Sequence, residues 1–102
     1  MNQRLEQLTK LQQTDPADPF LTYAIALEHV KAESHDEAIA WLDKTIELDG
    51  QYCYAYFQKA KMLSEKDESE QARQVLEFGI HMAKEAGDEK AQRELTELFE
   101  TM

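Results

Sequence analysis

The chain of 102 residues has few residues that break helices, with only three glycines and two prolines. Both types lie between segments whose apolar residues recur with helical spacing, so they mark the ends of helices. No segment alternates between apolar and polar residues with a period of two, which argues against strands. The sequence therefore predicts an all-α fold.

Cysteine and long apolar runs are also scarce. The single cysteine, Cys53, excludes an internal disulfide. No apolar run approaches the ~20 residues that a membrane-spanning helix needs, and the N-terminal residues lack the apolar stretch of a secretory leader. Together these absences predict a protein of the reducing cytoplasm that does not enter a membrane.

Basic residues are outnumbered: 11 lysines and arginines stand against 21 aspartates and glutamates, a net charge of −10. Nucleic acids and anionic membrane surfaces are bound through clustered basic side chains. We therefore expect neither as a partner.

Periodic apolar residues and capping signals predict about six helices. They span residues 2–13, 19–32, 35–50, 52–66, 69–87 and 88–102. Asp18 and Pro19 have the types preferred at an N-cap and at the first helical position. Ser34 and Glu37 have the form of a capping box, and Gly87 is a candidate left-handed C-cap.

The second and third helices repeat as the fourth and fifth at an offset of 34 residues. A helix pair repeated at this period is typical of a solenoid. Small residues at equivalent positions would allow the helices of a pair to approach closely, and larger ones would fill the space between pairs. The equivalent pairs include Ala26 and Ala60, Ala38 and Ala72, Leu42 and Leu76, Ile46 and Ile80, and Glu33 and Asp67.

Two segments resemble the tetratricopeptide repeat (TPR) family: residues 36–49 are similar to the second helix of its repeat, and residues 56–63 to the first. The resemblance implies a single TPR-like α-solenoid, with a leading half-repeat (1–16), two repeats (17–50 and 51–86) and a C-terminal capping helix (87–102). The sequence departs from the family pattern mainly at core positions and at repeat ends. The departures include Thr22, Thr45, Gly79, Lys59 and Gly50.

The helix predicted for residues 19–32 is apolar nearly all round, which is unusual for a surface helix. By resemblance to TPR proteins, one face of it and the equivalent face of residues 52–66 line a concave groove that holds a partner peptide or helix. The candidate groove residues are Phe20, Tyr23, Leu27, Val30, Tyr54, Phe57 and Lys61.

Three alternatives stay open for this apolar face. It binds another protein, it is covered by another part of the chain, or it closes against a second copy in a homodimer. Trp41 and Phe78 offer a second surface for self-association. TPR adaptors that hold chaperone tails use a clamp of lysines and asparagines. Because Tyr23 and Leu27 occupy its places in the first repeat, we do not expect such tails as partners.

No catalytic or cofactor-binding constellation emerges. The three glycines are scattered, so they cannot form a phosphate-binding loop. His29, His35 and His81 lack the spacing of a shared metal site. Cys53 begins a predicted helix, where a thiol pKa can fall, but a small residue at a turn or half-buried is the expected alternative. We therefore predict a non-enzymatic protein with no cofactor and no metal.

Overall fold

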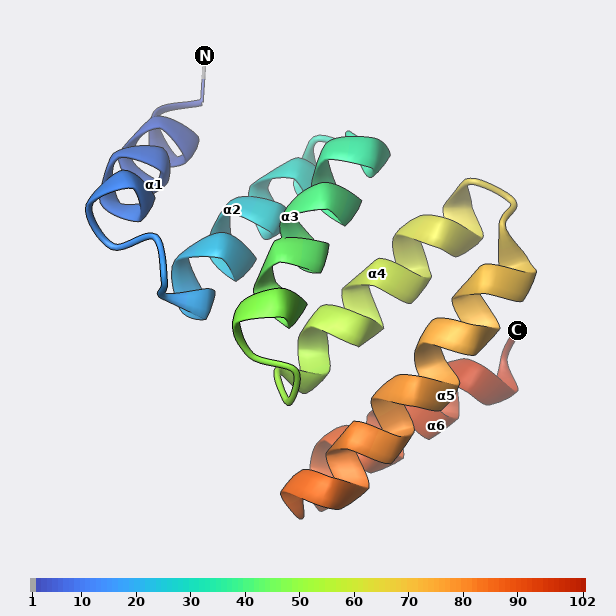
Figure 1. Ribbon diagram of the computed structural model, residues 1–102. Helices are drawn as coiled ribbons and strands as arrows, with labels where there is room; N and C mark the ends of the chain where they lie inside the picture. Colours follow the sequence, from blue (N-terminus) through green and yellow to red (C-terminus); the bar gives the residue numbers. More distant parts are fainter. Residues whose placement is uncertain (1) are drawn as a thin grey trace.

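The computed structural model describes residues 2–102, and Met1 lies outside them. This part of the chain forms α-helices joined by short turns and contains no strand, which confirms the all-α prediction. The helices are α1 (Gln3–Thr14), α2 (Pro19–Lys31), α3 (His35–Leu48), α4 (Cys53–Glu65), α5 (Ser69–Ala86) and α6 (Glu89–Glu100) (Figure 1). None of these helices is long and apolar enough to cross a membrane.

Most helix ends follow the sequence signals. The Asp18 carboxylate accepts a hydrogen bond from the Phe20 amide (2.9 Å), and Pro19 occupies the first helical position. Gly87 closes α5 with a φ of 70°. The expected capping box at Ser34 is wrong, because the Ser34 side chain makes no capping hydrogen bond. The side chains that do cap helices, Asn2, Asp18 and Asp88, are one atom longer than serine.

The turns that join the helices of each pair are equivalent. Glu33 and Asp67, which are 34 residues apart, both adopt left-handed backbone conformations, with φ values of 57° and 62°. The amide that follows each of them donates back into the preceding helix, from Ser34 to the His29 carbonyl and from Glu68 to the Leu63 carbonyl, both at 2.9 Å. The repeat seen in the sequence is thus a repeat of backbone geometry.

The helices form a solenoid. Each packs against the next in the chain, and α4 also contacts α2 and α6. Among the described residues α3 has no comparable contact with α1 or α5, so α2, α4 and α6 form the inner layer. The molecule measures 36 × 30 × 18 Å, with α1 and α6 at opposite ends of the stack (Figure 1).

The core is built on the predicted small and apolar positions. Ala26 and Ala38 in one helix pair, and Ala60 and Ala72 in the other, are fully buried. Among the larger residues expected between the pairs, Leu42 and Leu76 are equally buried, whereas Ile46 and Ile80 are partly buried and pack against the main core cluster.

Core positions that depart from the family pattern compensate for one another. Thr22 of α2 and Thr45 of α3 are both fully buried, and their hydroxyl oxygens lie 2.8 Å apart in a hydrogen bond. At the equivalent positions α4 has Tyr56 and α5 has Gly79. A Cβ atom added to Gly79 would lie only 2.8 Å from the Tyr56 Cβ, so α5 approaches α4 closely because residue 79 has no side chain.

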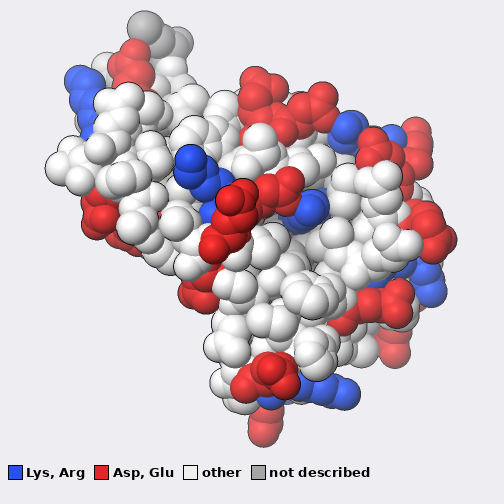
Figure 2. Space-filling view, viewed as in Figure 1, with Lys and Arg blue, Asp and Glu red and all other residues white. Residues whose placement is uncertain are grey.

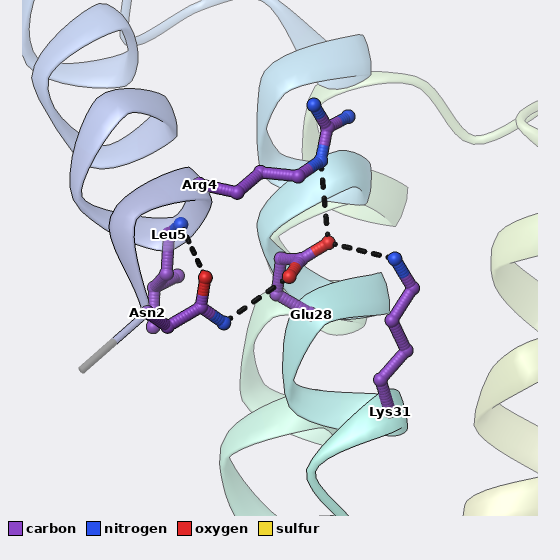
Figure 3. Close-up of polar contacts among 5 residues, drawn as sticks. All are labelled: Asn2, Arg4, Leu5, Glu28 and Lys31. Carbon is purple, nitrogen blue, oxygen red and sulfur yellow. Dashed lines mark hydrogen bonds and ion pairs between the residues drawn. The ribbon is translucent and has the colours of Figure 1, made fainter.

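The leading helix α1 is attached to α2 by both apolar and charged contacts. Leu8 packs with Ala24 and Ile25. The Glu28 side chain, only 8% exposed, accepts a hydrogen bond from Asn2 (3.1 Å) and forms ion pairs with Arg4 (3.3 Å) and Lys31 (3.1 Å) (Figure 3). Three donors therefore surround one shielded carboxylate, and two of them come from the first turn of α1 or its N-cap.

We expect the attachment of α1 to weaken in acid. The hydrogen bonds from Asn2 and Lys31 lower the pKa of Glu28 below its ordinary value. A lowered carboxyl pKa stabilises the folded state fully above the unfolded pKa of about 4.3, and this stabilisation is lost as the pH falls through the lower folded pKa.

Comparing urea unfolding of the wild-type protein with that of Glu28→Gln between neutral and acidic pH tests this expectation. Wild type should be the more stable near neutrality, and the difference should shrink in acid. Glu77→Gln, an exposed change on α5, is the control. A wild-type advantage that does not depend on pH would contradict the role given to the Glu28 charge.

Candidate partner-binding site

The seven candidate groove residues lie on α2 and α4, two helices of the inner layer. Phe20, at the start of α2, has 61% of its surface exposed. The other six candidates are each partly buried. Of these, Tyr54 and Phe57 pack against the main core cluster and Tyr23 packs against the cluster around Leu42.

The α2 half of the site is fixed by packing against α4. The ring centroids of Tyr23 and Tyr52 lie 4.8 Å apart, and both rings pack against a buried cluster that includes Ala26 and Ala55. Burial raises the pKa of Tyr23. Tyr23 therefore holds a set position at the junction between α2 and α4, whereas Phe20 extends into the solvent.

The α4 half is shared with α6. The Tyr54 hydroxyl donates to Glu94 Oε1 at 2.8 Å. This hydrogen bond to a carboxylate, together with burial, raises the pKa of Tyr54 to about 12. The Tyr54 and Phe57 rings meet edge to face with centroids 6.5 Å apart, and Lys61 Nζ lies 5.9 Å from the centre of the Phe57 ring.

A pocket opens between α4 and α6 beside these rings. Phe57 and Leu98 provide its apolar surface, and both pack against the main core cluster. Its remaining lining is polar and consists of Glu94, Glu97 and Thr101. The C-terminal helix thus forms one wall of the candidate site and leaves Phe57 partly exposed.

Sequence reasoning missed several residues of this site, namely Tyr52, Glu94, Glu97, Leu98 and Thr101. Tyr52 precedes α4 and is its N-cap residue, so it lies outside the helical spacing from which the groove residues are predicted. The α6 residues were missed because α5 has 18 residues where α3 has 14, so the 34-residue offset does not carry over from α4 to α6. Ala91 and Leu95, on the face of α6 that packs against the rest of the molecule, are fully buried.

Cys53 lies in a poor environment for a nucleophile. It is 5% exposed, and its thiol donates to the Gln51 carbonyl (3.3 Å). Burial and the nearby Asp88 carboxylate raise its pKa, which lowers the fraction of reactive thiolate at neutral pH. Within residues 2–102 no group of three or more histidine, cysteine, aspartate or glutamate side chains is arranged to hold a metal ion.

Comparison with solved structures identifies similar chains. A tetratricopeptide repeat domain protein from Salinibacter ruber is 32% identical over 85% of this chain and 88% of that one, with a TM-score of 0.79. The TPR2B domain of yeast Sti1, in complex with pHsp70, is 26% identical over 93% of this chain and 76% of that one, with a TM-score of 0.87.

A protein from Bordetella parapertussis has the same fold, with 23% identity over 99% of this chain and 88% of that one and a TM-score of 0.85. No protein-family model matches the chain, and no curated protein matches it.

Proposed function

Because the chain belongs to the tetratricopeptide repeat family, we propose that it is a non-catalytic interaction module that holds an apolar segment of a partner protein against α2, α4 and α6. One observation carries the choice of surface. Phe20 is 61% exposed at the end of a row of partly exposed apolar side chains on the inner layer. Exposed aromatic side chains beside apolar surface are typical of binding faces.

The partner of the Sti1 domain is not carried over to this chain. Tyr23 and Leu27 occupy positions at which chaperone-binding TPR domains have polar clamp residues, and the Tyr23 ring is packed against Tyr52. The surface suits a segment that has apolar side chains of its own. We place this activity in the cytoplasm, in keeping with a single buried cysteine.

The chain offers a matched pair of variants to test the binding face. Phe20 on α2 and Phe78 on α5 are both exposed phenylalanines, at 61% and 53%, but they lie in different layers. For a peptide selected from a random library, Phe20→Ser should weaken binding at least tenfold, about 1.4 kcal/mol. Phe78→Ser should leave the affinity nearly unchanged. Isothermal titration calorimetry gives both values.

The opposite pattern, with loss of binding only in Phe78→Ser, would show that the inner layer is not the binding face. Circular dichroism should show the same helical content for both variants, since neither side chain belongs to a buried cluster.

Self-association through the outer layer is the second candidate function. It is favoured by the exposure of Phe78, whose ring lies 5.7 Å from that of Tyr56 and 6.4 Å from that of His81. Light scattering distinguishes the two: a monomer of 11.8 kDa contradicts the dimer, and a dimer that Phe78→Ser dissociates supports it.

A further inference from the structure

The charge around the candidate binding face points to the chemistry of its partner. In the pocket between α4 and α6, Phe57 and Leu98 form an apolar floor beside the carboxylates of Glu94 and Glu97. The hydrogen bond from Tyr54 holds the Glu94 carboxylate in place, at 2.8 Å. In residues 2–102 neither Glu94 nor Glu97 forms an ion pair.

Further carboxylates lie along the row of aromatic rings. Burial raises the pKa of Tyr52, and the negative charges of Asp18 and Asp49 raise it further. The pKa of Tyr54 is raised mainly by the hydrogen bond to Glu94, and then by burial and by the Glu94 charge. The negative charge of Asp88 raises it further. The carboxylates of Asp18, Asp49, Asp88 and Glu94 therefore act on the rings of Tyr52 and Tyr54.

In residues 2–102 the basic side chains of α4, Lys59 and Lys61, form no ion pair with these carboxylates. Lys61 is near, but its Nζ is 5.9 Å from the Phe57 ring centre, at the outer limit for a cation–π contact. Lys59 pairs with Asp43 (2.6 Å), and Lys66, which follows α4, pairs with Asp36 (2.5 Å). Figure 2 views the molecule from the side on which α5 lies in front of α6, and on that side basic side chains lie beside acidic ones.

We propose that the partner segment is basic as well as apolar, and that one of its lysine or arginine side chains occupies the pocket between α4 and α6. The aliphatic part of that side chain lies on Phe57 and Leu98, and its charged group lies between Glu94 and Glu97. This inference rests on the proposed function and adds the charge of the partner. A segment of this kind gains ion pairs and cation–π contacts that an acidic segment would lose.

Short synthetic peptides with identical leucine positions test the proposal. The remaining positions are all arginine, all glutamine or all glutamate. Titration calorimetry at about 0.15 M salt, where charges are screened beyond about 8 Å, limits non-specific attraction. We expect the arginine peptide to bind most tightly and the glutamate peptide not to bind. The double variant Glu94→Gln and Glu97→Gln should lower the affinity for the arginine peptide by about fivefold or more.

The control is Glu70→Gln with Glu77→Gln, which makes the same change in net charge on α5. Equal weakening by the control, tighter binding of the glutamate peptide or no binding of the arginine peptide would each overturn the basic partner. Library-selected peptides separate this outcome from failure of the proposed function. If binding of these peptides depends on Phe20 but not on Glu94 and Glu97, the proposed binding face is supported and the cation pocket is refuted. If binding of none of them depends on Phe20, both proposals are refuted.

Discussion

Replacing Leu95 with alanine is expected to cost about 2–5 kcal/mol of unfolding free energy, as usual for truncating a buried leucine. Leu95 is fully buried and lies in the cluster that joins α6 to α4 and α5. A helix of 12 residues is unstable in isolation, so α6 depends on this docking. In a solenoid, whose units contact only their neighbours, the loss should begin at the C-terminal end.

Two spectroscopic signals separate local from global loss. The single tryptophan, Trp41, packs in the two clusters around α2 and α3, whereas circular dichroism reports all helices. In urea, Leu95→Ala should lose helical signal before its tryptophan fluorescence changes. Leu11→Ala, a truncation of a leucine that is 54% exposed, should shift stability by less than about 0.5 kcal/mol. Coincident, unshifted transitions in Leu95→Ala would show that α6 is not docked through this residue.

Gly79→Ala is expected to destabilise the protein by about 1–2 kcal/mol, although alanine is the better helix former. Helix propensity alone would stabilise it by about 0.5–1 kcal/mol, but overpacking a core costs about 1–3 kcal/mol. The added Cβ would lie 2.8 Å from the Tyr56 Cβ and 3.1 Å from its Cγ. A Cβ is fixed to its backbone, so no rotamer of Tyr56 relieves the contact and α4 and α5 must separate.

Gly50→Ala is the matched control for this substitution. A Cβ there would meet only the flexible end of Met82 at 3.7 Å and the Ile46 carbonyl oxygen at 4.0 Å, so stability should change by less than about 0.5 kcal/mol. Urea unfolding measures both variants. If Gly79→Ala were more stable than wild type, the close approach of α5 to α4 would not be a constraint on the fold.

Local signals predicted most of the fold but only part of the candidate site. Helix ends at Asp18, Pro19 and Gly87 depend on neighbouring residues alone, and the structure has them where expected. The 34-residue offset located the core alanines because α2 and α4 begin 34 residues apart, as do α3 and α5. Because α5 is longer than α3, the 34-residue offset does not extend to α6. The hydrogen bond between Tyr54 and Glu94 therefore could not be predicted from it.

Contacts between residues far apart in the sequence also could not be predicted from local sequence signals. Nothing near Glu28 in the sequence shows that Asn2 and Arg4 will surround it. Thr22 and Thr45 looked like two separate departures from a family pattern, and only the structure shows them as a hydrogen-bonded pair. Pairing of this kind depends on three-dimensional proximity, which periodicity does not encode.

The two ways of filling the space inside a helix pair limit how its parts can be recombined. A chimaera that joined α4 to α3 would set Tyr56 against the Cβ of Thr45, at a position where α5 has no side chain. The reverse chimaera, α2 with α5, would leave the Thr22 hydroxyl facing a glycine, without its partner on the second helix. Although the repeats share one backbone plan, each first helix is matched to its own second helix. The unit that can be exchanged or duplicated is the whole pair.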